Sequence, residues 1–183
     1  MQRFSYHELH QPLESYQHCG DLKRAAVLIP LIFHKHGIDV VLTKRAEHLK
    51  HHPGQISFPG GKAEDFDKDL QETALREATE EIGLPADVVD IIGQLKQYQT
   101  ISGYTISPFI AAIPNNYPFT IDQNEVAEIF TVPFSHFIDE GNHVSFEVNR
   151  GKTKHNIHFM PYLNYNIWGA TAAILKDLVL HLK

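Results

Sequence analysis

The chain has 183 residues, of which 43% are hydrophobic and 21% charged, and its net charge is −6. This length and composition predict one soluble globular domain spanning residues 1–183. The acidic balance argues against a general nucleic-acid binder, which would carry a basic stripe, and no apolar run approaches the roughly 18 residues of a membrane-spanning helix.

The single cysteine and the N-terminal segment predict the compartment in which the protein works. Cys19 is the only cysteine and cannot form an intrachain disulfide, and the first ten residues lack the apolar core of a signal peptide. We therefore expect a cytoplasmic protein. Residues 1–20 are polar and contain Pro12, which predicts a short helix or an arm packed on the surface. A homodimer is compatible with the sequence, which does not determine the oligomeric state.

Three strands are expected before the first helix, from runs of branched and apolar residues at 25–33, 38–43 and 55–58. The first two form a hairpin through the turn at 34–37, and the third leads into the glycine pair Gly60–Gly61. A helix from about Asp69 to Ile82 follows, and Gly83 and Pro85 end it.

The remainder of the chain predicts more strands and a closing helix. Strand patterns cover 88–96 and 104–113, a late hairpin covers 143–148 and 156–163, short helical or irregular pieces cover 125–130 and 134–138, and an amphipathic helix covers 166–182. Pro108 lies inside one strand, and because proline cannot donate a ladder hydrogen bond, it predicts an edge position or a bulge. Strands with helices before and after them predict an α/β fold whose sheet is covered on both faces.

The first helix carries a carboxylate cluster. Glu77, Glu80 and Glu81 lie three and four residues apart and share one side of the helix, where like charges repel. A hard divalent cation, Mg2+ or Mn2+, removes this repulsion because it takes oxygen ligands from carboxylates and substrate phosphates together. The pattern predicts a metal-assisted phosphate site, and the alternative is an ordinary charged helix face in which Arg76 pairs with Glu80.

The stretch from Gly60 to Leu84 resembles the Nudix box, the signature of hydrolases that cleave a nucleoside diphosphate linked to another group. Its second half, R-E-A-T-E-E-I-G-L, matches the family pattern position by position. Its first half departs from that pattern. The pattern has Glu six positions after its glycine, and counting from Gly61 this position is Asp67. The interval from Gly61 to Arg76 is one residue longer than in the pattern. The role of Asp67 therefore stays open.

Residues 42–61 resemble a second element, L-T-K-R-x-x-x-L-x-x-H-x-G-Q-[VI]-x-F-P-G-G, which marks the coenzyme A pyrophosphatases within the Nudix family. Boxes of that subgroup share the one-residue extension, and residues 167–172 weakly resemble its terminal helix. The resemblance implies the Nudix α/β/α sandwich with a mixed central sheet. It also implies metal-dependent hydrolysis of coenzyme A or acyl-coenzyme A to 3′,5′-ADP and (acyl-)4′-phosphopantetheine.

Two other functions remain open. The box recognises only the metal and the pyrophosphate, so another nucleoside diphosphate derivative, such as ADP-ribose or a dinucleoside polyphosphate, is the alternative substrate. The third reading is a non-catalytic Nudix-fold ligand-binding module. Such modules typically lose carboxylates from the helix, whereas all three are present here.

The residues that we expect to bind metal are Glu77, Glu81 and Glu80, and the resemblance adds a backbone carbonyl at Gly60 or Gly61. Arg76 is expected to orient Glu80 through a guanidinium–carboxylate pair. By resemblance, a glutamate from a distant loop completes the metal site or activates the water, and Glu125 is the first candidate, with Glu128 second. The alternative for Glu125 is a carboxylate at a helix N-terminus.

The partner is expected to be a phosphorylated small molecule, because basic residues gather around the motif of an otherwise acidic chain. The candidate substrate-binding residues are Lys44, Arg45, His52, Gln55 and Lys62. Lys44 and Arg45 end a strand and point to opposite faces, so one can face the phosphates while the other is solvated. His52 either contacts substrate or packs beneath the Gly54–Gln55 turn. Trp168 either stacks on adenine or packs in the core.

Overall fold

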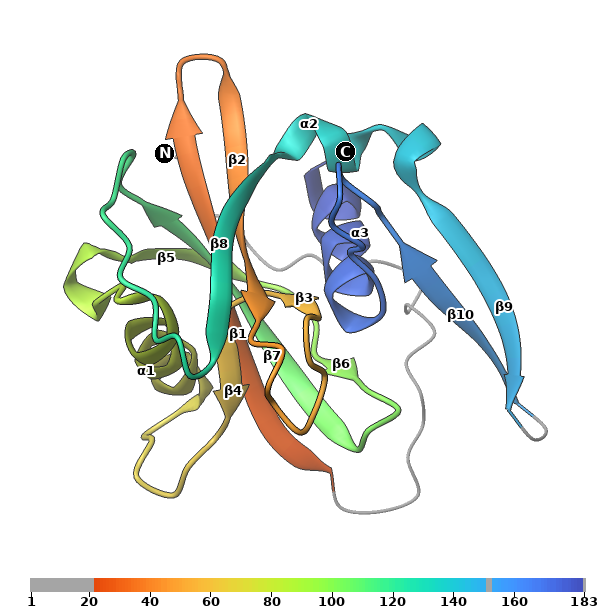
Figure 1. Ribbon diagram of the computed structural model, residues 1–183, viewed down its shortest axis with the longest axis horizontal. Coiled ribbons are helices and arrows are strands. Elements are labelled where there is room, and N and C mark those ends of the chain that lie inside the picture. Colours follow the sequence, from red (N-terminus) through yellow and green to blue (C-terminus); the bar gives the residue numbers. More distant parts are fainter. Residues whose placement is uncertain (1–21, 151–152, 183) are drawn as a thin grey trace.

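The computed structural model describes residues 22–150 and 153–182 (Figure 1). The arm or helix expected at residues 1–20 lies outside the described residues, as does Cys19. Within the described ranges, no helix is both long and apolar enough to cross a membrane.

A mixed sheet forms the centre of the fold, as predicted. Its strand order is β3-β2-β1-β7-β5, and β1 pairs antiparallel with β2 but parallel with β7. Three further strands, β4, β6 and β8, pair with β1, β7 and β2 respectively. The bounds are β1 Lys23–His34, β2 Gly37–Arg45, β3 Ile56–Ser57, β4 Gly60–Lys62, β5 Asp90–Gln94, β6 Tyr98–Gln99, β7 Tyr104–Ile113 and β8 Val126–Pro133.

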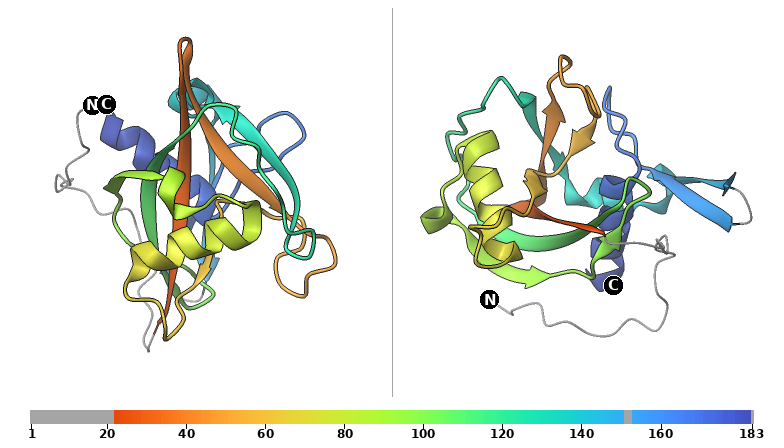
Figure 2. Two further views of the ribbon diagram at one scale, coloured as in Figure 1. Left: turned by 90° about the vertical axis from the view of Figure 1, so that its left-hand side faces the viewer. Right: turned by 90° about the horizontal axis from the view of Figure 1, so that it is seen from below.

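Helices cover both faces of this sheet (Figures 1 and 2). Helix α1 (Leu70–Ile82) lies on one face, and α2 (Phe134–Ile138) and α3 (Ala170–Leu182) lie on the other. Each face has its own buried cluster because strand side chains alternate. Ala26 and Leu28 of β1 pack with the α1 cluster, whereas Ile29 and Leu31 pack with the α3 cluster. The expected α/β/α sandwich is therefore confirmed.

Strand β2 parts from β1 after four residue pairs, and this parting shapes the site. The β1–β2 ladder covers Leu31–His34, and β4 takes the place of β2 beside residues 25–27 of β1. The end of β2 pairs instead with β3 and β8. The glycine pair of β4, the end of β2 and helix α1 consequently meet at one place.

Helix α1 begins and ends where its sequence predicts. The Asp69 side chain accepts a 2.8 Å hydrogen bond from the Glu72 N–H, which satisfies a free donor of the first turn. Gly83 closes the helix in the left-handed conformation, at φ 65°, and its N–H bonds to Thr79 O. Two short 3-10 turns, η1 (Ala86–Val88) and η2 (Glu140–Asn142), follow later in the chain.

The predicted edge position of Pro108 is wrong. Strand β7 is internal, with β1 on one side and β5 and β6 on the other. Leu95 N donates to Pro108 O, so the missing N–H of Pro108 also points to the β5 side. Pro108 lies opposite the break between β5 and β6, where the sheet does not require a hydrogen bond from its backbone nitrogen. The register shift falls on β5, between Ile91 and Gly93.

Two further boundaries differ from those expected. Residues 125–130 are not helical, because residues 126–133 form β8, which pairs with residues 39–45 of β2. The closing helix begins at Ala170 rather than at residue 166, after Gly169 with φ 66°. The late hairpin is confirmed as β9 (Val144–Arg150) and β10 (Thr153–Phe159), which form a separate two-stranded sheet. The expected helical piece at 134–138 is also confirmed, as α2.

Candidate active site

The carboxylate cluster of α1 extends from the protein interior to solvent. Glu81 is buried, Glu77 is partly buried, and Glu80 is exposed. Gly60 N donates a 3.1 Å hydrogen bond to Glu81 Oε2, and Arg45 Nη1 lies 3.7 Å from Oε1. Burial, with a smaller effect of the Glu77 charge, raises the pKa of Glu81 to about 8. Burial also raises the pKa of Glu77.

The two glycines of β4 lie in close packing at this place. Gly60 has φ 155°, and a Cβ there would lie 2.4 Å from Ala26 O of β1, so only glycine lets the β4 backbone approach β1. A Cβ on Gly61 would lie 2.5 Å from the Glu77 carboxylate and would displace the end of that side chain.

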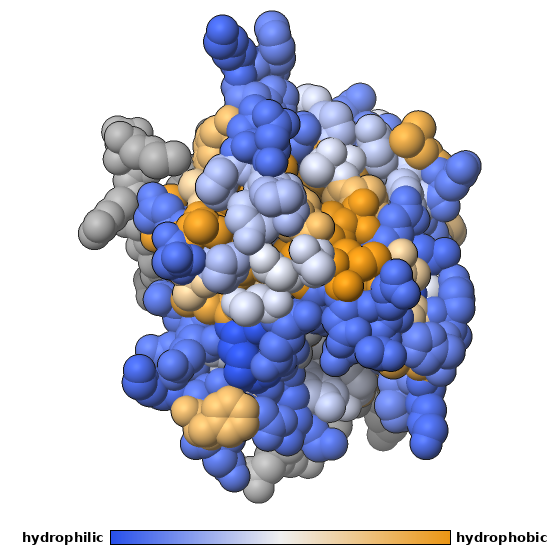
Figure 3. Space-filling view, turned by 60° about the vertical axis from the view of Figure 1, so that its left-hand side comes forward, coloured by the Kyte–Doolittle hydropathy of each residue, from blue (hydrophilic) through white to orange (hydrophobic). Residues whose placement is uncertain are grey.

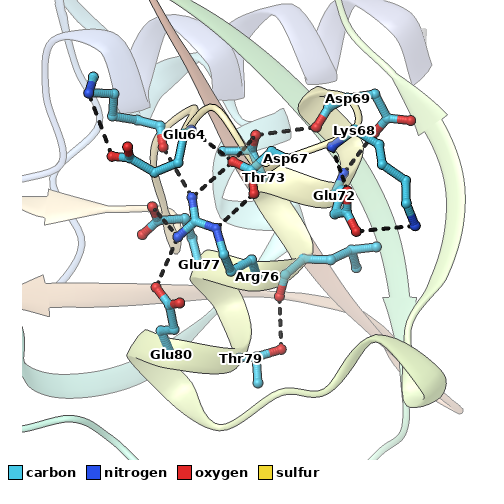
Figure 4. A network of polar contacts seen from close by, with 12 residues as sticks. Glu64, Asp67, Lys68, Asp69, Glu72, Thr73, Arg76, Glu77, Thr79 and Glu80 are labelled. Carbon is cyan, nitrogen blue, oxygen red and sulfur yellow. Dashed lines mark hydrogen bonds and ion pairs between the residues drawn. The ribbon is translucent and has the colours of Figure 1, made fainter.

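Arg76 organises the outer part of the cluster (Figure 4). Its guanidinium holds Asp67 through two hydrogen bonds, of 2.9 Å from Nε and 3.1 Å from Nη2. Nη1 also donates to Glu77 at 2.9 Å and to Glu80 at 3.0 Å, and Nη2 donates to Lys62 O. The pair with Glu80 that the spacing predicts is thus present, but Asp67 is the bidentate partner.

Asp67 is a site residue whose role the sequence left open. Its side chain is almost fully buried, and it accepts hydrogen bonds from Glu64 N and from the Thr73 hydroxyl as well as from Arg76. The Arg76 hydrogen bonds hold the pKa of Asp67 well below its usual range. Asp67 in turn raises the pKa of Arg76. The signal was its position six residues after Gly61, where the family pattern has Glu.

Glu125 reaches the cluster from the loop before β8. Its carbonyl accepts from Ala46 N, and the neighbouring Asp122 N donates to Glu81 O at the end of α1. The charge of Glu125 contributes to raising the pKa of both Glu77 and Glu81, so its carboxylate lies near enough to act on both. The alternative of a helix N-terminal carboxylate is wrong, because a strand follows Glu125.

The basic candidates divide between two environments. Arg45 points toward Glu81, whereas Lys44 forms a 3.0 Å ion pair with Glu47 on the other side of β2. They point apart as expected, but neither is simply solvated. Lys62 is exposed and lies 3.6 Å from Glu64. The side of the molecule that carries α1 presents mainly hydrophilic side chains in its lower half, which suits a charged substrate (Figure 3).

A cavity of about 720 Å3 lies beside the end of β2, and Lys44, His52 and Gln55 line it. His52 is exposed with φ 55°, so the expectation that it packs beneath the Gly54–Gln55 turn is wrong. Trp168 also lines the cavity and is 38% exposed. It precedes α3 and stacks on Phe159, so the alternative that Trp168 packs in the protein core is wrong.

The donor set fits a hard divalent cation. Across residues 22–150 and 153–182, no three His, Cys, Asp or Glu side chains already form a coordination shell. However, Glu77 and Glu81 are carboxylates desolvated side by side, and a cation that takes oxygen ligands would stabilise their charged forms. Because Gly61 has no side chain, the Glu77 carboxylate has room beside its backbone.

Comparison with known proteins supplies the family context. The NUDIX domain model matches residues 22–151. The chain is 41% identical over 156 residues to an uncharacterized Nudix hydrolase NudL of Yersinia pestis (strain Pestoides F), covering 85% of this chain and 78% of that protein. NudL of Yersinia pseudotuberculosis serotype O:1b (strain IP 31758) gives the same values.

Two solved structures share the fold. A C. elegans Ap4A hydrolase in a binary complex aligns with TM-score 0.53 and 16% identity, over 61% of this chain and 80% of that one. The Nudix hydrolase RenU from M. smegmatis aligns with TM-score 0.53 and 24% identity, over 62% of this chain and 72% of that one.

Proposed function

The chain belongs to the Nudix hydrolase family, and from this premise we propose that it cleaves the pyrophosphate of coenzyme A or an acyl-coenzyme A. Pyrophosphohydrolysis of nucleoside diphosphate derivatives is the activity of the family. The observation that supports the finer proposal is the 42–61 element. It contributes Arg45 and Gly60 to the carboxylate site and Lys44 and Gln55 to the adjoining cavity.

Nudix hydrolases generally use Mg2+ or Mn2+, and we propose Glu77, Glu80, Glu81 and the Gly61 carbonyl as the ligands here. When bound, the cation would neutralise phosphate charge and lower the pKa of a coordinated water. The protein keeps the ligands in place through contacts already formed, because Gly60 N holds Glu81, and Arg76 holds Glu77 and Glu80. Arg76 is itself fixed by Asp67, so it acts as a positioning residue.

We propose Glu125 as the group that accepts a proton from the attacking water. It comes from a separate loop, it is exposed, and its charge acts on Glu77 and Glu81. Arg45 lies beside Glu81 and would face the phosphates, whereas Lys44 would contact the substrate on the cavity side. His52, Gln55 and Lys62 complete the proposed binding residues.

The experiment that tests this proposal compares coenzyme A, dephospho-coenzyme A and ADP-ribose at equal Mg2+ or Mn2+. A charge-assisted hydrogen bond to the 3′-phosphate contributes about 1.5–3 kcal/mol, or roughly one to two powers of ten in kcat/KM. We therefore expect coenzyme A to be cleaved best, and a chelator to abolish release of 3′,5′-ADP. Equal values for the first two would refute reading of the 3′-phosphate, and faster cleavage of ADP-ribose would favour the alternative substrate.

A pair of lysine variants localises the effect. Lys62→Met should reduce the preference for coenzyme A over its dephospho form, because Lys62 is an exposed cation beside the Gly60–Gly61 turn and lies outside the cavity. Lys35→Met removes the same charge from the β1–β2 turn and should leave the preference unchanged. Equal preference in both variants would show that the 3′-phosphate does not contact Lys62.

A further inference from the structure

Strand β9 exposes an apolar face. Its sequence alternates apolar and polar residues, so Val144, Phe146 and Val148 project from one side of the strand. These side chains are 42%, 57% and 42% exposed. In a soluble protein such a face normally packs on a core, and an exposed apolar patch marks a binding surface.

This face is continuous with the cavity beside β2. Phe159 of β10 pairs with Val144, and its ring contacts Phe146 edge-to-face, with centroids 5.5 Å apart. On its other side Phe159 stacks on Trp168 at 6.1 Å, and Trp168 lines the cavity. We call Val144, Phe146, Val148, Phe159 and Trp168 the apolar strip. From Val144 to Val148 it extends about 13 Å, at about 3.3 Å per residue.

The cavity itself changes character across its width. Lys44, His52 and Gln55 line it on the side of β2, and residues of the 163–168 segment line the other side. There Trp168 and Leu163, which is 81% exposed, supply apolar surface beside the polar Asn164 and Asn166. Lys44 directly precedes Arg45, the residue that faces Glu81. A substrate whose pyrophosphate lies at Glu81 therefore reaches the cavity around the end of β2, and a tail extending beyond the cavity meets the apolar strip.

We propose that the apolar strip binds the acyl chain of an acyl-coenzyme A, so that this enzyme prefers thioesters of medium or long chains over free coenzyme A. The inference rests on the proposed function, which it deepens. Continuity with the cavity favours the substrate's own tail over a second copy of the chain as the occupant. The hairpin projects from the body beside α3, where an extended chain can lie along it (Figure 1).

Kinetics over a chain-length series test this assignment. Full burial of a methylene multiplies affinity roughly fourfold, and a chain lying on an open surface gains about half that free energy, or roughly twofold per methylene. Contact by about three or four methylenes is therefore enough for decanoyl-coenzyme A to exceed coenzyme A in kcat/KM by about tenfold, and this is the smallest ratio that we expect. Phe146→Ser should remove most of this ratio, and Phe146→Leu, which keeps an apolar side chain, should retain it. Ile101→Ser, at a residue 45% exposed in the turn before β7, is the matched control and should leave the ratio unchanged.

Trp168 provides a second readout, because it is the only tryptophan. In a chelator, which prevents turnover, decanoyl-coenzyme A below its micelle concentration should change the Trp168 emission more than coenzyme A does. Equal emission changes, or equal kcat/KM values with coenzyme A cleaved, would overturn the inference. It would also be overturned if Phe146→Ser converted a dimer to a monomer and left the ratio unchanged. An emission response to the acyl compound without cleavage of any coenzyme A substrate would refute the proposed function and leave the strip as a site for apolar ligands.

Discussion

Replacing Glu81 by Gln separates what this carboxylate does for the metal from what it does to the fold. Burial raises the pKa of Glu81 from 4.5 to about 8. Between these values the unfolded chain has lost a proton that the folded protein retains. The stability contributed by protonated Glu81 is therefore complete below about pH 4.5 and is lost as the pH rises to about 8. From pH 4.5 to 7, at about 1.4 kcal/mol per pH unit, the loss is about 3 kcal/mol.

Glu81→Gln should remove this loss. The amide oxygen can still accept from Gly60 N, while the new NH2 group lacks an evident acceptor and costs about 1 kcal/mol. In a chelator at pH 7 the variant should therefore be more stable by about 2 kcal/mol, which raises Tm by roughly 4–8 °C for a domain of this size. The difference should grow from pH 5 to pH 8, whereas added Mn2+ should stabilise the wild type alone.

Thermal and urea unfolding at pH 5, 6, 7 and 8, with and without metal, measure these effects. The rate of hydrolysis by Glu81→Gln should fall by at least about 100-fold. Replacing a group that only positions a metal ligand typically costs about 10–100-fold, and loss of a ligand itself should cost more. Glu80→Gln makes the same chemical change at an exposed side chain and should alter stability by less than about 0.5 kcal/mol. If Glu81→Gln is no more stable than wild type at pH 8 in a chelator, burial does not disfavour the Glu81 charge and the reasoning is refuted.

Three other substitutions test the surrounding structure. Asp67→Asn breaks a buried bidentate pair with Arg76 and should lower the free energy of unfolding by about 2 kcal/mol or more at pH 7. Asp65→Asn, at an exposed residue, should not lower it. Equal urea midpoints for the two variants would contradict this expectation. Because the pKa of Asp67 is lowered from 3.8, its contribution is complete above about pH 4, and the Asp67→Asn difference should shrink in stronger acid. Gly61→Ala should displace the Glu77 carboxylate and lower kcat/KM while the protein still folds, as circular dichroism would show. Gly60→Ala meets backbone at 2.4 Å and should reduce folding itself; a fully folded Gly60→Ala protein would refute the packing argument.

Several features could be predicted because short-range chemistry decides them. Asp69 caps α1 and Gly83 ends it, since a side-chain acceptor and a left-handed residue act within one turn. The β1–β2 hairpin follows from two apolar runs joined by a turn at Gly37. The shared side of Glu77, Glu80 and Glu81 follows from the helical period alone.

Other features depended on distant partners. Residues 126–133 become a strand because β2 offers an open edge along their whole length, which no local pattern in 125–130 revealed. Pro108 is accommodated inside the sheet because the neighbouring strands break opposite it. Trp168 faces a cavity instead of the core because the chain turns at Gly169 before α3 begins.

The sequence by itself determined which chemistry this chain carries: a carboxylate helix behind a glycine pair, and basic residues beside it. Only the tertiary structure decided how each group behaves. Glu81 has a raised pKa because the fold buries it, and this outweighs the opposing effects of the Gly60 N–H and the Arg45 charge. Asp67 has a lowered pKa because Arg76 reaches it from α1. The reason is physical, since residue type sets charge and hydrogen-bonding capacity, whereas desolvation and pairing depend on which remote segments the fold brings into contact.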